Sequence, residues 1–192
     1  LDFSLEVISM MTRFILTLFW RIPATDDTVS DLFRRSEIKS NGVDPELFRN
    51  DPTFLKMERG RLFHHTIDQI RLFGKRTSAS VNVHEFASPI ILLGDNPIIF
   101  RSTPSSFEDL GEIDLLIAVS SNRIYSITEK KLPGLTFDNA ISYNTNVILQ
   151  SRRYVVARNL DTLEKPIKTF KLCVKLGVRA FRPERIFEAG NT

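Results

Sequence analysis

The sequence predicts one α+β domain over residues 1–192, with a helical N-terminal layer packed on a small, mainly antiparallel sheet. Apolar residues recur at three- and four-residue steps in the first third of the chain, which is typical of helices. Short alternating or apolar runs follow between residues 80 and 127, which is typical of strands. The length of 192 residues is enough for one domain with a sizeable core.

The N-terminal helices are predicted from their period and their end signals. Pro23 ends the first helix, because the residue before a proline disfavours the helical region. Asp26 is a suitable cap for the second helix, and Pro52 suits the first turn of the third. The predicted helices span residues 3–22, 26–39 and 51–73.

The middle of the chain has the pattern of a sheet followed by one more helix. The predicted strands span residues 80–86, 90–93, 98–100, 113–119 and 123–127. A helix over 138–153 then leads into a strand-like stretch at 154–157. The tail beyond it mixes basic and apolar residues and fits either a strand or a helix.

Charge is unevenly divided along the chain. Residues 1–150 contain 16 Lys/Arg and 19 Asp/Glu, a formal charge of −3, whereas the remainder contains 10 and 4, a formal charge of +6. The basic tail either steers acidic partners toward the protein or is a solvated surface. Cys173 is the only cysteine, so neither an internal disulfide nor a thiolate cluster can form, which favours a cytoplasmic location.

The apolar N-terminal stretch does not predict a membrane segment. Glu6 and Arg13 interrupt it, and its longest apolar run is far below the ~20 residues that span a bilayer. The cleavage pattern of a signal peptide is also missing. We therefore expect no membrane partner. Because the first residue is leucine, we expect the N-terminal part of a longer protein to precede it.

The stretch Gly94-Asp95-Asn96-Pro97 stands between two apolar runs and predicts a turn. At a strand end, its carboxylate and amide are also suited to bind a cation, a hydroxyl-rich ligand or a base edge. Arg21 follows the first predicted helix, and Asn144 lies in the late one. Arg21 is able to form an internal ion pair with Asp95, or these polar residues share one hydrogen-bond network. The resulting candidate polar cluster is Arg21, Asp95, Asn96 and Asn144.

A second set of candidates consists of basic residues that could contact phosphates. They are Arg152, Arg153, Arg158, Lys165 and Lys168. Such a track makes nucleic acid an alternative partner, although no zinc finger or glycine-rich nucleotide loop accompanies it.

Metal-dependent chemistry has two weaker sequence signals. Asp95 with Glu129-x-Lys131 superficially matches an Asp…Glu-x-Lys arrangement that holds Mg²⁺ in nucleases. His64, His65 and Asp68 share one predicted helix, and His84 lies on a separate strand. A solvated loop explains Glu129-x-Lys131 equally well, and the histidines lack a third ligand of evident spacing. We therefore predict neither a metal nor a cofactor.

Four ordered segments resemble the bacterial domain of unknown function 4238 family. The segments are FILTLFWRIPATDD (14–27), ILLGDNPIIF (91–100), LLIAVSSNRIYSIT (115–128) and ISYNTNVILQSRRYVVA (141–157). The family residues that this chain keeps are Arg21, Pro23, Asp95, Asn96, Pro97 and Asn144. It departs from the family pattern at Leu18, Ile22 and Gly94, and in the stretch 118–121, where only a serine is kept. The resemblance implies a bacterial protein but transfers no activity.

Two functional hypotheses follow from these residues. The first is a non-catalytic ligand-binding or interaction domain, which we favour because each motif has an adequate structural explanation. The alternative is a nucleic-acid-associated protein or a metal-dependent nuclease.

Overall fold

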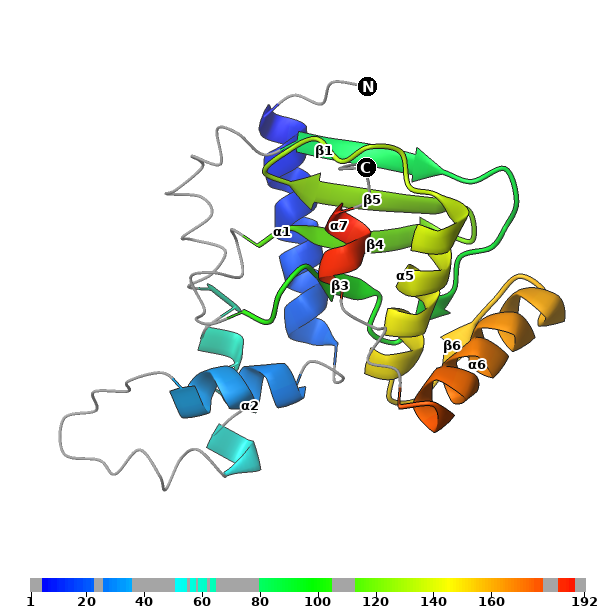
Figure 1. Cartoon of the computed structure of the whole chain (residues 1–192). Helices are drawn as coiled ribbons and strands as arrows, with labels where there is room; N and C mark the ends of the chain where they lie inside the picture. The colour runs from blue at the N-terminus through cyan, green and yellow to red at the C-terminus, as the bar shows by residue number, and fades with distance from the viewer. Residues whose placement is uncertain are drawn as a thin grey trace, which may run out of the picture.

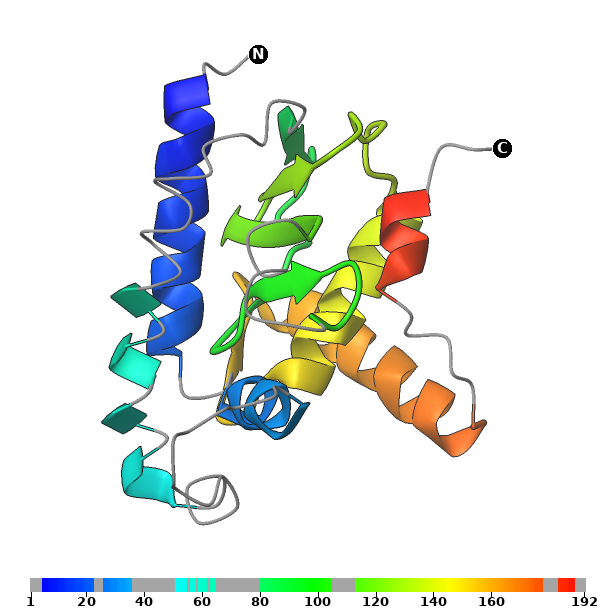
Figure 2. The ribbon, with the colours of Figure 1, turned by 90° about the vertical axis from the view of Figure 1, so that its left-hand side faces the viewer.

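A four-stranded antiparallel sheet with the order β1-β5-β4-β3 separates two layers of helices. The computed structural model describes residues 5–22, 26–35, 51–54, 56–57, 59–61, 63–64, 80–104, 113–177 and 183–188. Figure 2 shows α1 on one face of the sheet and α5 with α7 on the other. The predicted α+β class with an antiparallel sheet is confirmed.

Each strand of the sheet presents alternate side chains to the two layers. The strands are β1 (Ser80–Glu85), β3 (Ile98–Phe100), β4 (Leu115–Ser120) and β5 (Arg123–Thr128). On β3, Ile98 packs in the core beside α1, whereas its neighbour Ile99 packs in the core beside α5. A two-residue turn joins β4 to β5, and the register is irregular between Ala118 and Ser120.

Helix α1 (Leu5–Arg21) covers the first face through an apolar stripe. Ile15, Leu16 and Phe19 are fully buried against the sheet, whereas Met10 and Phe14 of the same helix are exposed. Helix α2 (Asp26–Arg35) follows and adds Val29 and Leu32 to the same core. The predicted continuation of the second helix over 36–39 and the part of the predicted third helix over 65–73 lie outside the described residues.

Helix α5 (Phe137–Gln150) covers the second face, where Ala140, Tyr143 and Val147 are buried. Its N-terminus is fixed by a capping box, in which Thr136 and Asn139 exchange side-chain and main-chain hydrogen bonds. The short helix α7 (Glu184–Glu188) packs on α5 and contributes Ile186 and Phe187 to the second core.

The basic tail, whose sequence fits either a strand or a helix, forms a helix over residues 160–175. Helix α6 (Leu160–Lys175) begins at Asn159, whose side chain accepts a hydrogen bond from the Thr162 N–H, and it packs on α5. Pro166 lies inside α6, where its missing N–H and its ring disfavour a helix, which explains why the sequence pattern was ambiguous. Figure 1 shows α6 on the far side of α5 from the sheet.

Two predicted elements are shorter than expected. The predicted helix 138–153 ends at Gln150, and the predicted strand 90–93 pairs only from Leu93 onward. A separate two-stranded sheet forms from β2 (Leu93–Gly94) and β6 (Val155–Val156). Among the helices described, none is long and apolar enough to cross a membrane.

Candidate functional site

The GDNP turn is bound to the segment that follows α5. Both carboxylate oxygens of Asp95 accept main-chain hydrogen bonds, Oδ1 from Arg152 at 3.0 Å and Oδ2 from Arg153 at 2.9 Å. The Asp95 N–H in turn donates to the Tyr154 carbonyl at 3.3 Å. The predicted turn residue is therefore a clamp that fixes the backbone of residues 152–154. The bonds use only the main-chain N–H groups of the two arginines, and both arginine side chains are exposed.

Gly94 allows this close approach between the turn and the end of α5. A Cβ atom at position 94 would overlap the Ser151 Oγ and would lie 2.9 Å from Val147 Cγ1. No side chain fits there without displacing one of them, so this glycine serves a close packing contact rather than an unusual dihedral angle.

Asn96 contributes to the same junction mainly through its backbone. Gln150 Nε2 donates to the carbonyls of Asn96 at 2.7 Å and Ile98 at 2.9 Å, which ties the last turn of α5 to β3. The side-chain Oδ1 of Asn96 is buried and has no hydrogen-bond partner among the described residues, and the same holds for Ser151 Oγ. The turn is therefore held chiefly by Asp95 and Gln150.

Asn144 is a bridge inside the second core. Its Nδ2 donates to the Ile90 carbonyl at 2.7 Å, and its Oδ1 accepts from the Leu92 N–H at 2.8 Å. One side-chain amide thus replaces the pairing that a neighbouring strand would give to residues 90–92. This explains why the apolar run 90–93 is largely not a strand although it is extended and buried.

Arg21 does not join the other three members of the predicted polar cluster. It is exposed at the end of α1, the helix on the opposite face of the sheet from α5, and no ion pair with Asp95 forms among the described residues. Asp95, Asn96 and Asn144 each join residues 90–97 to α5 or to the connection after it, at different points along the helix. Three of the four candidates thus belong to this junction, and Arg21 does not.

The end of α1 is instead capped by Arg59, a residue that the sequence reasoning missed. Its guanidinium donates to the carbonyls of Phe19, Trp20 and Ile22 and forms an ion pair with Asp26. A cation at this position satisfies carbonyls that lack helical partners and complements the negative end of the helix dipole. Burial lowers the pKa of Arg59 from its usual value. No local spacing signals this contact, because Arg59 is distant in sequence from α1.

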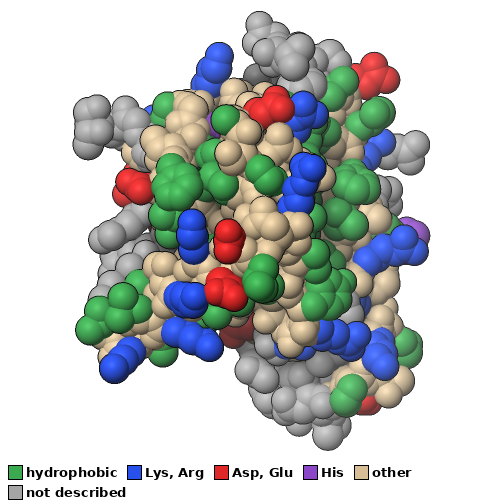
Figure 3. Space-filling model, turned by 90° about the vertical axis from the view of Figure 1, so that its right-hand side faces the viewer, with side chains coloured by type: hydrophobic (Ala, Val, Ile, Leu, Met, Phe, Trp, Pro, Cys, Tyr) green, Lys and Arg blue, Asp and Glu red, His purple; other side chains and the backbone are tan. Residues whose placement is uncertain are grey.

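All five candidate phosphate-contacting residues are exposed. Arg152 and Arg153 follow α5, Arg158 precedes α6, and the two lysines lie on α6. Lys168 Nζ lies 2.7 Å from Glu164 Oε2, and this hydrogen bond raises the pKa of Lys168 and lowers that of Glu164. Figure 3 shows Lys and Arg side chains mixed with hydrophobic ones on the side of the molecule where α6 lies. We call the exposed surface of residues 151–177, which carries these five residues, the basic side.

The nuclease-like carboxylates do not meet. Strands β3 and β5 are both antiparallel to β4, so they run in the same direction. Asp95 precedes β3 and Glu129 follows β5, which places these two residues at opposite ends of the sheet. Within the part of the chain that the structure describes, no group of three His, Cys, Asp or Glu residues could hold a metal ion.

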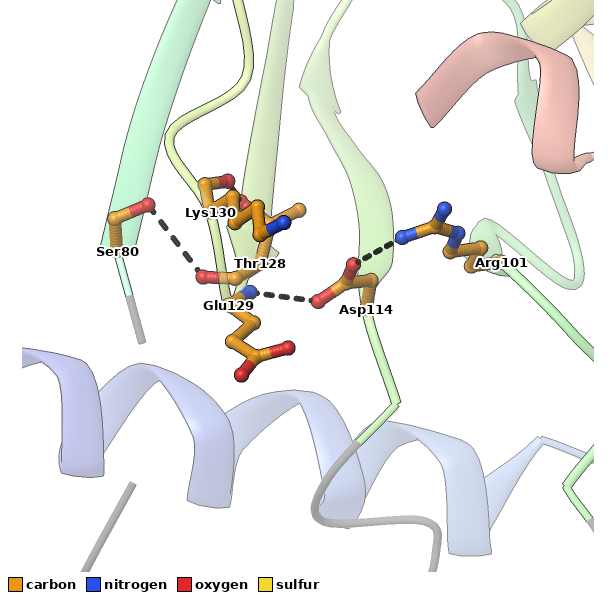
Figure 4. A network of polar contacts seen from close by, with 6 residues as sticks. All are labelled: Ser80, Arg101, Asp114, Thr128, Glu129 and Lys130. Atoms are coloured by element: carbon orange, nitrogen blue, oxygen red, sulfur yellow. Dashed lines mark hydrogen bonds and ion pairs between the residues drawn. The ribbon is translucent and has the colours of Figure 1, made fainter. Parts of the chain in front are cut away.

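Asp114, rather than Asp95, lies beside Glu129. Figure 4 shows its carboxylate between the main chain of Glu129 and the side chain of Arg101. Oδ1 accepts the Glu129 N–H at 2.7 Å, and Oδ2 lies 3.2 Å from Arg101 Nη1. Both oxygens of Asp114 are thus engaged in joining the ends of β3, β4 and β5, which is a structural role.

Of the candidate histidines, His84 is the best defined. It is buried on β1, and its Nε2 lies 2.9 Å from Ser126 Oγ on the neighbouring strand β5. Burial lowers its pKa below the usual value. Since Ser126 is completely buried, no substrate can reach this pair from solvent. His64 is exposed, and His65 and Asp68 lie outside the described residues.

The sequence reasoning also missed the exposed hydrophobic residues between the arginines. Tyr154 and Val156 are 59% and 52% exposed, whereas Val155 and Ala157 pack against the second core. The strand-like pattern of residues 154–157 contained the signal, because alternate residues of a strand point to opposite sides. The alternation in residues 154–157 does not indicate which set of side chains faces the protein interior.

No family model matches the chain, and neither a curated protein nor a solved structure matches it significantly. The resemblance of four segments to the domain of unknown function 4238 family therefore stays a prediction. The protein is therefore classified here by its architecture alone. It is an α+β fold with a small sheet between helical layers, and Asp95 binds the backbone of the two arginines that follow α5.

Proposed function

We propose that this chain is a non-catalytic interaction domain that recognises an acidic partner through its basic side. The observation that carries the proposal is the double hydrogen bond from Asp95 to the backbone of Arg152 and Arg153. Both oxygens of the Asp95 carboxylate are thereby engaged within the fold, while the side chains of the two arginines are exposed. A backbone that is already fixed loses less conformational entropy when a partner binds.

Charge on this side supports the same proposal. Residues 151–177 contain seven Lys/Arg and two Asp/Glu, a formal charge of +5. Such a concentration of one sign steers an acidic partner toward the surface and raises its association rate. Asp114, Asn144 and His84 are all engaged in contacts within the fold, which supports recognition rather than catalysis.

A nucleic-acid partner is the second candidate, and one observation favours it. Tyr154 is exposed between Arg153 and Arg158, and an aromatic ring flanked by cations is suited to stack on a base while the arginines contact phosphates. This candidate predicts a steep fall of affinity with salt, in proportion to the number of phosphate contacts.

The test compares two labelled probes by fluorescence anisotropy: a decapeptide of alternating Glu and Ser, and single- or double-stranded oligonucleotides with Mg²⁺. The variants are Arg152→Ser/Arg153→Ser and the matched control Lys130→Ser/Lys131→Ser, which removes the same charge from the far end of the sheet. We expect the arginine variant to weaken peptide binding at least fivefold and the control to change it less than twofold.

Other outcomes decide against the proposal. Failure of the peptide to bind, or equal losses in the two variants, would remove the specific interaction surface. Oligonucleotide binding at least tenfold tighter than peptide binding, with a steep salt slope, would favour the nucleic-acid candidate. Shortened oligonucleotides after incubation would instead establish a nuclease.

A further inference from the structure

The stretch from Tyr154 to Arg158 has one side in the protein and one in solvent. Tyr154, Val156 and Arg158 are exposed, and the intervening Val155 and Ala157 face the second core. This alternation is that of a strand with one free face. We name this free face, with Arg152 and Arg153 at its beginning, the Arg-Tyr-Val face.

The backbone of the Arg-Tyr-Val face is held from one direction only. Val155 and Val156 pair with Gly94 and Leu93 of β2, and the Tyr154 carbonyl accepts the Asp95 N–H. In the described part of the chain, no second strand pairs with β6. A strand with an unpaired edge is able to accept an extended segment of another chain by adding main-chain hydrogen bonds.

The side chains of the face select what such a segment must contain. Two uncharged side chains with large exposed areas, those of Tyr154 and Val156, lie between arginines on both sides. In an extended chain, the distance from residue 154 to residue 158 is about 13 Å, so five partner residues span it. Tyrosine and arginine are also the residue types that are enriched at protein interfaces.

Resting on the proposed function, we infer that the partner is an extended acidic segment of a protein, with aliphatic side chains between its carboxylates. Its aliphatic groups cover Tyr154 and Val156, and its carboxylates meet Arg152, Arg153 and Arg158. Leu160, which is 66% exposed at the start of α6, adds further apolar area beside them. A nucleic-acid backbone leaves Val156 and Leu160 in water, and therefore uses less of this surface.

The test uses two capped seven-residue peptides of equal charge. One has Glu at both ends, Val and Ile at the third and fifth positions, and Ser or Thr between them; the control has Ser at the third and fifth positions. In both peptides the charge pattern is the same in the two chain directions, so binding along β6 in either orientation is tested. Binding to the full chain is followed by NMR through the amide resonances, with Tyr154→Ser, Val156→Ser and the control Val119→Ser, whose exposed side chain lies on β4.

We expect the apolar peptide to shift the resonances of residues 152–160 and to bind at least fivefold tighter than its control. Tyr154→Ser and Val156→Ser should remove that difference without changing the affinity for the control peptide, and Val119→Ser should preserve it. Thermal unfolding of each variant shows that the fold is kept.

Several results would overturn the inference. Equal affinity for the two peptides, with loss in Arg152→Ser/Arg153→Ser, leaves an acidic partner but removes the aliphatic pattern. Binding of neither peptide removes both this inference and the proposed function. Tighter binding of a single-stranded oligonucleotide that is lost in Tyr154→Ser, or of phosphatidylserine vesicles that is lost in Val156→Ser, assigns the face to another class of partner.

Discussion

The carboxylate of Asp95 accepts the main-chain N–H of Arg153 at 2.9 Å, and its second oxygen accepts that of Arg152 at 3.0 Å. These bonds join the turn before β3 to the connection after α5, which are more than fifty residues apart in the sequence. The clamp links two sets of candidate residues that the sequence presented as separate: it belongs to the polar cluster, and it positions the first two arginines of the basic track.

Asp95→Asn should lower the free energy of unfolding by about 1–2 kcal/mol, because an amide offers one acceptor where the carboxylate offers two and loses the charge assistance. Urea denaturation measures the change. The matched control is Glu129→Gln, which removes one charge at an exposed position, and it should change stability by less than about 0.5 kcal/mol. Equal stability of Asp95→Asn and the wild type would mean that the clamp contributes nothing.

Tyr143→Phe should destabilise the fold although it keeps the aromatic ring. The buried hydroxyl donates to the Pro97 carbonyl at 3.0 Å and accepts the Ala118 N–H at 2.8 Å, and burial raises its pKa, so it stays protonated. Its removal leaves a buried N–H without a partner, at a cost of about 1–3 kcal/mol. Tyr154→Phe, at an exposed position, is the control and should be neutral. Equal midpoints in urea for both variants would contradict this role.

Gly94→Ala should lower stability by about 1–3 kcal/mol, because the new methyl group overlaps Ser151 Oγ and crowds Val147. Ser151→Ala alone should cost little, since that hydroxyl is buried without a partner. The double variant should recover part of the loss and no more, because the contact with Val147 remains. The free energies of unfolding of the four proteins form a double-mutant cycle, and strict additivity in it would show that residues 94 and 151 do not interact.

The elements that the sequence predicted are those with local signals. Helix α1 and the strands β3, β4 and β5 follow from the period of their apolar residues, and the turn at Asp95 follows from its residue types. The prediction was less accurate where a distant contact replaces the local rule. Residues 90–92 have the composition of a strand, but the side chain of Asn144 takes the place of a neighbouring strand.

The candidate site was predictable only in part for the same reason. Asp95, Asn96 and Asn144 were identified by residue type, and each joins residues 90–97 to α5 or to the connection after it. The side chains of Asp95 and Asn144 bind main-chain groups, and Asn96 is bound through its own carbonyl, so these contacts carry no sequence signature. Arg21 was assigned to the end of α1 by its position, whereas Arg59 caps that end from a distant segment. The Arg-Tyr-Val face depends on which side of β6 is buried, and this is decided by packing against α5 and its neighbours.

His84 makes the stability of the fold sensitive to mild acid. Its buried imidazole lies 2.9 Å from Ser126 Oγ, and burial lowers its pKa in the folded state, whereas in the unfolded chain the pKa is about 6.5. Below pH 6.5 the unfolded state therefore binds more protons than the folded state. Stability must fall as the pH decreases through 6.5 and must level off, for this group, below the folded pKa.

His84→Gln should make that dependence shallower, because an amide is able to bond to Ser126 without titrating. Chemical denaturation at pH 7.5, 6.5, 5.5 and 5.0 measures it, and the difference in slope should approach but not exceed about 1.4 kcal/mol per pH unit, the limit for one proton. His64→Gln changes an exposed histidine and should keep the wild-type slope. If the His84 and His64 variants share the wild-type slope, His84 is already able to accept a proton in the folded protein. Its hydrogen bond with Ser126 is then too accessible to water for burial to control it.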